Sequence, residues 1–212
     1  AGNDRIYGGI GNDRVDGGDG DNYLDGGEGD DLLDAKEGDD VMIGGPGADH
    51  IEAGGGNDYV EGGDGNDTIS GEEGNDRLFG GDNNDFFYGG AGDDEIYGGN
   101  GADRLIGDAG SDRLWGGAGP DWFAFKGVGA LDGVDRIEDF QDGLDLIVLE
   151  KLGITSYSAS GAAGTIFAAD ATNGDVVLHG VTSAGASLTI EVTDANGTLL
   201  AANFSAADFL FV

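Results

Sequence analysis

Acidic side chains that could bind metal ions recur every nine residues through the first 121 positions of the chain. The series has fourteen members, and all but one are Asp: Asp4, Asp13, Asn22, Asp31, Asp40, Asp49, Asp58, Asp67, Asp76, Asp85, Asp94, Asp103, Asp112 and Asp121. Carboxylate oxygens are the ligands that hard divalent cations prefer, and the absence of Cys excludes thiolate sites for softer metals. The sequence has no H-E-x-x-H or G-x-S-x-G motif, so it indicates metal binding without enzyme chemistry.

The acidic series belongs to a nonapeptide repeat, G-G-x-G-x-D-x-U-x with U apolar, that fills residues 8–124 with thirteen unbroken copies after a partial copy at residues 1–7. Position four is Gly except at Asn83. Asn tolerates left-handed backbone best after Gly, so we expect a positive φ there. Position eight is apolar in all copies: Ile6, Val15, Leu24, Leu33, Met42, Ile51, Val60, Ile69, Leu78, Phe87, Ile96, Leu105, Leu114 and Phe123.

The repeat predicts three-residue strands that alternate with six-residue turns. Side chains alternate across a strand, so only the middle residue, at position eight, would face inward. One inward residue in nine cannot build a globular core, but it suits a narrow roll in which two repeats form each coil. Coils would stack about 4.8 Å apart, with turns 18 residues apart directly above one another. We therefore predict an all-β fold, a right-handed parallel β-roll, with two columns of stacked Asp turns.

Carboxylates stacked at strand spacing repel one another unless a cation lies between them. Ca²⁺ suits such a gap because it accepts six to eight oxygen ligands in flexible geometry, whereas Mg²⁺ requires a stricter octahedron. Two Asp carboxylates and the carbonyls of the Gly-rich turns can supply these oxygens. Each column has six gaps, which allows at most twelve ions. Asn22 and the column ends weaken some sites, so we expect about ten Ca²⁺ ions.

The charge of the chain is concentrated in the repeats. Residues 1–124 hold 31 of the 43 acidic residues and six basic ones, a net charge of −25 out of −34. Ten to twelve Ca²⁺ ions would nearly neutralise this region. So acidic a surface repels phosphate backbones and anionic lipids, and no apolar run approaches 18 residues. We expect no nucleic-acid partner and no membrane insertion.

The composition changes near residue 125, where the repeats end and alternating apolar runs begin. We divide the chain into a roll, residues 1–124, and a β-rich cap, residues 125–212. The cap would cover the open sheet edge of the last coil. Strands are predicted at residues 122–126, 144–149, 165–169, 175–178, 187–192 and 209–212, separated by Gly and Asn-Gly turns.

Aromatic side chains at position nine increase toward the cap. Phe79, Tyr97 and Trp115 would stack on one outer face, with Tyr88 and Ile106 on the other. They suit a cover for the sheets or, as an alternative, a platform for sugar rings. Arg recurs at position seven and would offset acidic neighbours, although a polyanionic sugar could also use these residues: Arg5, Arg14, Arg77, Arg104 and Arg113.

Residues 1–124 resemble the RTX (haemolysin-type calcium-binding) repeats of secreted bacterial proteins. Residues 120–154 resemble the C-terminal module of serralysin-type metalloproteases and of calcium-dependent alginate epimerase R-modules, through an I-x-D-F-x-x-G-x-D-x-I stretch that runs from Ile137 to Ile147. Asp139, Gly143 and Asp145 match that stretch.

The resemblance implies that each Ca²⁺ takes the position-six Asp of two stacked turns. Carbonyls of positions one and three would come from one turn, and those of positions two and four from the other. Lys36, at position two, departs from the pattern and places a cation near one site. Besides the position-six series, the candidate ligand residues are Gly44, Gly45, Pro46, Gly47, Ala53, Gly54, Gly55, Gly56, Gly62, Gly63, Asp64, Gly65, Gly71, Glu72, Glu73, Gly74, Gly80, Gly81, Asp82, Gly89, Gly90, Ala91, Gly92, Gly98, Gly99, Asn100, Gly101, Gly107, Asp108, Ala109 and Gly110.

The resemblance also implies a function: a calcium-binding module that folds outside the bacterial cell and supports type I secretion and stability of a larger secreted protein. The ending SAADFLFV resembles an uncleaved type I secretion signal, and a plain terminal strand explains it about as well. The chain begins inside a repeat without a signal peptide, so we expect upstream domains that hold any catalytic activity. The alternatives are a polysaccharide-binding module like an epimerase R-module and an adhesin or surface-layer segment.

Overall fold

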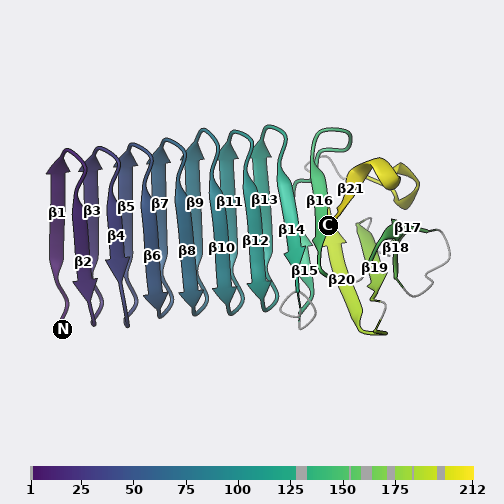
Figure 1. The fold of residues 1–212 in the computed structure, drawn as a ribbon, viewed down its shortest axis with the longest axis horizontal. Coiled ribbons are helices and arrows are strands. Elements are labelled where there is room, and N and C mark those ends of the chain that lie inside the picture. The colour runs from purple at the N-terminus through teal and green to yellow at the C-terminus, as the bar shows by residue number, and fades with distance from the viewer. Residues whose placement is uncertain are drawn as a thin grey trace.

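A computed structural model of the chain describes residues 2–127, 133–152, 154–158, 164–170, 175–182, 184–194 and 199–212. The molecule is an elongated stack of strands with an irregular cap at its C-terminal end (Figure 1). The roll strands are β1 (Arg5–Ile10), β2 (Arg14–Gly18), β3 (Tyr23–Glu28), β4 (Leu32–Ala35), β5 (Val41–Pro46), β6 (His50–Gly55), β7 (Tyr59–Asp64), β8 (Thr68–Glu73), β9 (Arg77–Asp82), β10 (Phe86–Ala91), β11 (Glu95–Asn100), β12 (Arg104–Ala109) and β13 (Arg113–Ala118).

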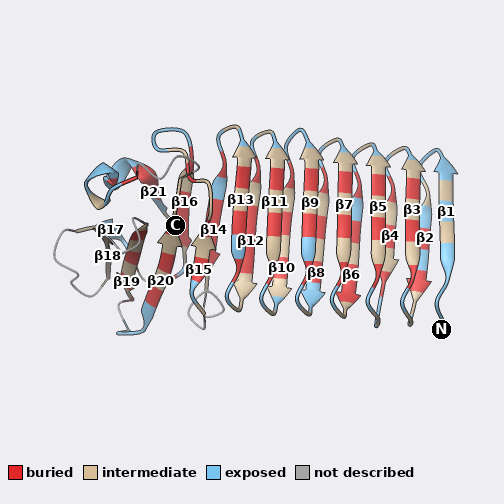
Figure 2. Ribbon diagram, turned by 180° about the vertical axis from the view of Figure 1, so that it is seen from behind, coloured by how far each residue is buried: buried red, intermediate tan, exposed pale blue. Residues whose placement is uncertain are grey.

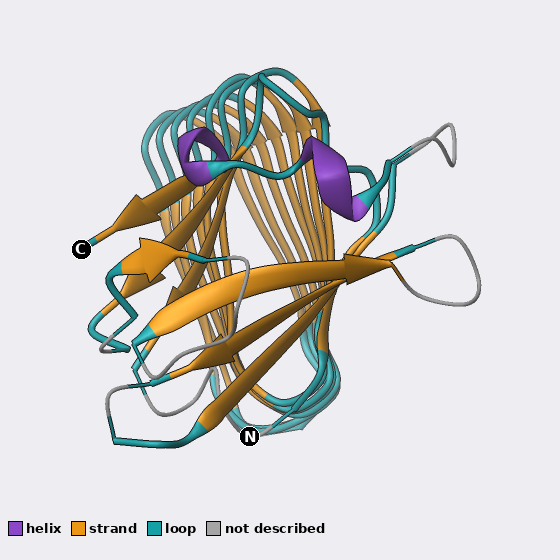
Figure 3. Ribbon diagram, turned by 90° about the vertical axis from the view of Figure 1, so that its right-hand side faces the viewer, coloured by secondary structure: helices purple, strands orange, loops and turns teal. Residues whose placement is uncertain are grey.

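These strands form two parallel ladders, which confirms the predicted β-roll. Odd-numbered strands from β1 to β13 lie in order in a 12-stranded sheet, and even-numbered strands from β2 to β12 lie in order in a 9-stranded sheet. Neighbours are 18 residues apart in register, as in the pairing of Phe79 with Tyr97 and of Tyr97 with Trp115. Seen along the roll, the two sheets face each other, and the turns stack along both sides (Figure 3).

The strands are longer than the sequence predicted. Most roll strands have six residues, not three, because the first three residues of the next repeat continue the strand, which leaves positions four to six as the turn. Position four has the predicted positive φ throughout the described repeats, including 79° at Asn83. Position two also has a positive φ in most coils, which the sequence analysis did not foresee, and non-Gly residues adopt it at Glu72 (74°) and Asp108 (68°).

The core of the roll is a single file of position-eight side chains between the sheets. From Val15 to Phe123 each of these residues is at most 3% exposed, whereas Ile6 in the first coil is only partly buried. Position one is buried as well, so burial alternates along each strand (Figure 2). Gly at position one lets the two sheets and the turn approach closely.

The cap extends both sheets beyond the repeats. Its elements are β14 (Trp122–Lys126), β15 (Asp135–Ile137), β16 (Leu146–Glu150), β17 (Ser156–Tyr157), β18 (Thr165–Asp170), β19 (Val176–Val181), β20 (Ser187–Val192), η2 (Ala201–Asn203), η3 (Ala206–Asp208) and β21 (Phe209–Phe211). β14 and β15 pair in parallel with β12 and β13, so the ladders run on past residue 124. Residue 124 therefore marks a change in composition, and its role as a domain boundary stays a prediction.

Two predicted cap strands, 122–126 and 187–192, match β14 and β20 residue for residue, and four others shift at their ends. The sequence analysis missed β15 and β17, which have only three and two residues. β18, β19 and β20 form an antiparallel meander that joins the roll through β15. The Asn-Gly turns at 173–174 and 196–197 lie outside the described residues. In the part of the chain that the structure describes, no helix is long and apolar enough to cross a membrane.

Candidate metal sites

The position-six residues form two columns of stacked turns, one on each side of the roll. We name them the Asn22 column, with Asp4, Asn22, Asp40, Asp58, Asp76, Asp94 and Asp112, and the Asp31 column, with Asp13, Asp31, Asp49, Asp67, Asp85, Asp103 and Asp121. In both columns each backbone N–H donates to Oδ1 of the position-six residue 18 positions later, at 2.6 to 3.0 Å. This bond fixes the direction of the position-six side chains from Asn22 and Asp31 onward.

The second oxygen of each carboxylate has no partner. Oδ2 is buried and accepts no hydrogen bond in twelve residues: Asp13, Asp31, Asp40, Asp49, Asp58, Asp67, Asp76, Asp85, Asp94, Asp103, Asp112 and Asp121. A buried charge is very costly unless it is paired, and native proteins leave few polar groups unsatisfied. The same unpaired oxygen recurs twelve times in two rows. This repetition indicates that each oxygen needs a positively charged partner of the same kind.

Burial also disturbs the ionisation of these groups. Loss of hydration raises the pKa of Asp67 and Asp76 to about 6, although a backbone N–H bond to each carboxylate opposes the shift. Burial raises the pKa of Asp85 and Asp94 to about 8, and the like charges of stacked Asp neighbours add to it. A divalent cation beside these carboxylates would reverse both effects, because it favours the ionised form.

The space beside each orphaned oxygen is lined with oxygen. A Cβ on Gly26, at position one, would lie 2.5 Å from Oδ2 of Asp31 and 2.7 Å from the carbonyl oxygen of Gly44 in the next coil. The same arrangement recurs at Gly98, between Asp103 and the carbonyl of Gly116. Gly at position one keeps this space open between two stacked turns.

Carboxylate and carbonyl oxygens in this arrangement fit Ca²⁺. Among the described residues, no group of three or more Asp, Glu, His or Cys side chains gathers at one point. An ion in the gap would therefore complete its shell with backbone carbonyls, which Ca²⁺ accepts readily and Mg²⁺ or softer metals do not. The candidate ligands at positions one to four lie in the strand ends and turns that border each gap. Their role as ligands stays a prediction.

The columns continue into the cap, which the sequence analysis missed. The amide of Asp112 donates to Oδ1 of Asp135 at 3.1 Å, and that of Asp121 to Oδ1 of Asp145 at 3.0 Å. Asp139 accepts bonds from the amides of Gly116 and Gly117, both at 2.9 Å, and so covers the last turn. These steps span 23 and 24 residues, so the nine-residue period carried no signal, and only the D-F-x-x-G-x-D stretch marked the place.

Position five supports the turns in a second way that the sequence analysis missed. Its side chains accept hydrogen bonds from the backbone of the following coil, as Oδ1 of Asp39 does from the amide of Asn57 at 2.8 Å. Asn75 and Asn84 act in the same way along their columns. These exposed bonds run opposite to those of position six. A frequent Asn or Asp at position five was the available signal.

The predicted aromatic ladder is present on the outer face of the 12-stranded sheet. Phe79 and Tyr97 stack with ring centroids 4.7 Å apart, and Tyr97 and Trp115 with centroids 4.2 Å apart. On the other sheet Ile106 is buried, with Tyr88 packed against it. The ladder rings stack face to face along the sheet, and their role as a cover stays a prediction.

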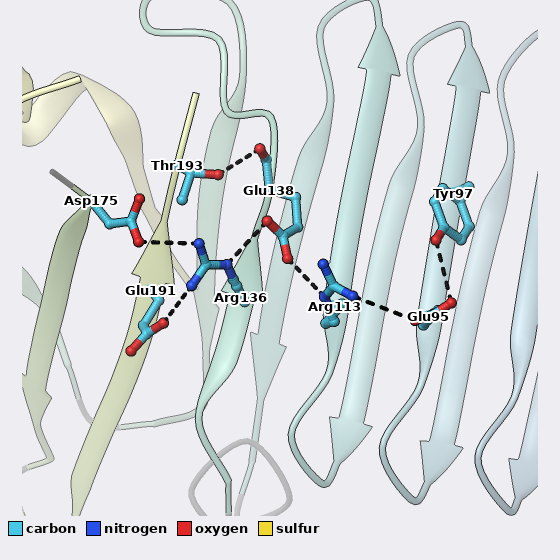
Figure 4. A network of polar contacts seen from close by, with 8 residues as sticks. All are labelled: Glu95, Tyr97, Arg113, Arg136, Glu138, Asp175, Glu191 and Thr193. Carbon is cyan, nitrogen blue, oxygen red and sulfur yellow. Dashed lines mark hydrogen bonds and ion pairs between the residues drawn. The ribbon is translucent and has the colours of Figure 1, made fainter. Parts of the chain in front are cut away.

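Among the ion pairs of the described residues, four of the five position-seven arginines pair with acids, as predicted. Arg14 contacts Asp34 at 3.1 Å, and Arg77 contacts Glu95 at 3.1 Å. Arg113 continues this line toward the cap through Glu138, at 2.8 Å (Figure 4).

Comparisons with known proteins agree with this geometry. A family model for the RTX calcium-binding nonapeptide repeat matches residues 1–33, 34–69, 61–96 and 88–123. No curated protein matches the chain in sequence. Among solved structures, the extracellular lipase LipA from Serratia marcescens is 18% identical, with a TM-score of 0.41, and the match covers 100% of this chain and 40% of that one.

Two subunits of a mannuronan C5-epimerase from Azotobacter vinelandii are also similar. AlgE6R2 is 20% identical, with a TM-score of 0.35 and coverage of 93% of this chain and 91% of that one. AlgE6R3 is 18% identical, with a TM-score of 0.30 and coverage of 99% and 78%. The family match alone covers more than half of the sequence, and the chain therefore belongs to the RTX calcium-binding nonapeptide repeat family.

Proposed function

We propose that this protein is a folding module that becomes ordered when Ca²⁺ binds between its stacked turns. One observation carries the proposal: twelve buried carboxylate oxygens, aligned in two columns, have no partner in the protein. Ca²⁺ would supply the positive charge that these oxygens lack. The position-six carboxylates and the carbonyls of positions one to four would hold it.

The geometry also supports the expected number of ions. Ten of the twelve orphaned oxygens face a following repeat turn, and the other two, on Asp112 and Asp121, face the cap. Each gap that has an orphaned oxygen and carbonyls on both sides would take one ion. The protein would then bind about ten Ca²⁺ ions within its repeats.

Folding would depend steeply on the calcium concentration. An ion that binds only the folded chain adds about 2.7 kcal/mol of stability when its free concentration is a hundred times its Kd. Several such ions act on one cooperative stack, so their contributions accumulate over a narrow range of concentration. Without them, the net charge of −25 in the repeats opposes folding.

This dependence suits a segment of a larger secreted bacterial protein. In a cytosol poor in calcium the repeats would stay unfolded and fit for export by a type I secretion system, and outside the cell they would fold. At the C-terminus, β21 pairs with β16 and closes the 9-stranded sheet. The same residues would act as the secretion signal before folding.

Far-ultraviolet circular dichroism tests the proposal directly. The purified chain in EGTA should show the spectrum of a largely unfolded protein, and millimolar Ca²⁺ should restore the β signal. Mg²⁺ at the same concentration should restore far less. Equal β content in EGTA and in Ca²⁺ would overturn the proposal.

Polysaccharide binding has less support from the geometry. A sugar ring needs the open face of an aromatic side chain, and the faces of Phe79, Tyr97 and Trp115 are stacked on one another. The guanidinium of Arg113 lies over the ring of Trp115, 4.7 Å from its centroid. The ladder is therefore better suited to shield the sheet than to bind sugar. Affinity electrophoresis in alginate with Ca²⁺ present would show retardation if the alternative held.

A further inference from the structure

We propose that the turn at Asn22 binds no calcium, because the side-chain amide of Asn22 takes the place that a cation has in the Asp turns. The inference rests on the proposed function, since it concerns the same sites. It assigns Asn22 as the residue that makes one gap of the roll independent of metal. The two columns then bind different numbers of ions.

The amide of Asn22 bonds to the carbonyls that a calcium ion would use. Its Nδ2 donates to the carbonyl oxygens of Gly18, at 3.2 Å, and Gly20, at 2.5 Å. These residues are at positions two and four, whose carbonyls would serve the gap that follows their own turn. The side chain is 3% exposed, so the two bonds lie in the interior of the turn.

The orientation of the amide is set by the column. Oδ1 of Asn22 accepts the backbone N–H of Asp4 at 3.0 Å, as the Oδ1 atoms of the Asp residues do in the later coils. This leaves Nδ2 where Asp has Oδ2. In the Asp turns that atom is a buried oxygen without a partner, and at Asn22 it is a donor with two. A neutral side chain thus satisfies a turn that elsewhere lacks a positive charge.

The turn across the same gap departs from the pattern as well. Ala35 replaces Gly at position one, as Ala53 does in the next coil, and is 4% exposed. Lys36 replaces Gly at position two without a positive φ. β4 ends at Ala35, and the pairing of β2 with β4 shifts between Asp16 and Gly18.

Lys36 adds a positive charge on the side of the following coils. It lines a hollow together with Asp34, Glu37, Glu52 and Glu72. Because the amide of Asn22 satisfies its own turn, the Asn22 column starts its ion sites at Asp40, and the Asp31 column starts them at Asp13.

Ion counting by native mass spectrometry, after exchange into a calcium-containing volatile buffer, tests the inference. In Asn22→Ala the ion count should equal that of the wild type, and the melting temperature in Ca²⁺ should fall because two carbonyls lose their donor. A count lower by one ion would show that Asn22 holds calcium and would overturn the inference.

The reciprocal change provides the second arm. In Asp67→Asn the count should fall by at least one ion, because Asp67 borders two gaps, and the variant should melt at a higher temperature than Asp67→Ala, whose side chain offers no donor. Asn22→Asp combined with Ala35→Gly and Lys36→Gly should gain one ion. An unchanged count in both of these variants would overturn the inference. A wild type that binds no calcium would instead overturn the proposed function.

Discussion

The roll and the cap satisfy their charged groups in different ways. In the roll, most coils repeat the same two buried Asp turns, and twelve position-six carboxylates keep one oxygen without a partner in the protein. In the cap, Arg136 contacts Glu138, Asp175 and Glu191 at 2.8 to 3.1 Å (Figure 4). Arg136 thus pairs three acids of the cap within the chain, whereas twelve buried oxygens of the roll have no partner in the protein.

The hydrophobic core of the roll is also less extensive than that of the cap. The roll buries one large side chain per repeat in single file, whereas the cap gathers Phe140, Phe204 and Phe209 into contact and packs them against the meander. A single file buries little apolar surface for each residue that it orders. The comparison teaches that the repeats lack a sufficient core of their own, and it predicts that calcium removal affects the roll first.

A pH change in EGTA should produce the largest effect, because it acts on many roll carboxylates at once. Asp58 and Asp85, for example, have pKa values of about 7 and about 8 in the calcium-free fold, against an ordinary value of 3.8. Between about pH 4 and pH 8 the folded chain therefore binds more protons than the unfolded chain, and stability falls as the pH rises. Circular dichroism in EGTA should show more β structure at pH 5 than at pH 8.

Calcium should reverse this trend, because its carboxylate ligands must be ionised. The Ca²⁺ concentration needed to fold the chain should rise as the pH falls from 8 to 5. If β structure increased on acidification equally with and without Ca²⁺, the carboxylates of the roll would not be the calcium ligands.

Substitutions that create a cavity in the core should have the next largest effect, and they should distinguish the roll from the cap. Phe87→Ala in the roll should cost about 3–5 kcal/mol, and Leu178→Ala in the cap about 2–5 kcal/mol, because both side chains are fully buried. Phe87→Ala should raise the midpoint of a calcium titration followed by circular dichroism. Leu178→Ala should change that midpoint much less, and equal shifts would mean that roll and cap fold as one calcium-dependent unit.

The ion pairs within the cap should have a smaller effect. Arg136→Met removes a partly buried cation that three carboxylates share, and we expect a loss of about 1–2 kcal/mol in denaturant unfolding with Ca²⁺ present. Arg77→Met is the matched control, because Arg77 is 56% exposed and pairs only with Glu95 among the ion pairs of the described residues. It should cost under about 0.5 kcal/mol. Equal losses would remove the distinction between paired charge in the cap and surface charge on the roll.

Relief of backbone strain should have the smallest effect on the stability of the roll. Glu72 has a φ of 74° at a position where most coils have Gly, so Glu72→Gly should stabilise the roll by about 0.5–1 kcal/mol. The neighbouring Glu73→Gly, without a positive φ, should destabilise it by a similar amount. Thermal unfolding in saturating Ca²⁺ measures both, and a destabilising Glu72→Gly would contradict the assignment of strain.

The period of the sequence predicted most of the roll. Position eight could be identified as core because a nine-residue repeat with one apolar site allows only one inward file, and Asn83 marked the left-handed turn position. The length of the strands could not be predicted, because Gly has low strand propensity and only the stacking of neighbouring coils extends Gly62 and Gly63 into β7.

The candidate sites were predictable in place but incomplete in extent. Asp135 and Asp145 continue the columns through loops of different length, so their register depends on how the cap folds onto β13 and β14. The unpaired oxygens are likewise a property of three-dimensional packing. A sequence shows that Asp recurs, but only the fold shows that one oxygen of each is bonded and the other is not.

Hydrogen exchange measured by mass spectrometry, with and without Ca²⁺, tests the calcium dependence of the roll most directly because it reports on the roll and the cap separately. We predict that in Ca²⁺ the amides of β5 to β13 exchange slowly, as expected for stacked interior coils, and that in EGTA they exchange nearly as fast as in an unfolded chain. If these amides kept their protection in EGTA, the roll would be held together without calcium, which would contradict calcium-dependent folding of the repeats.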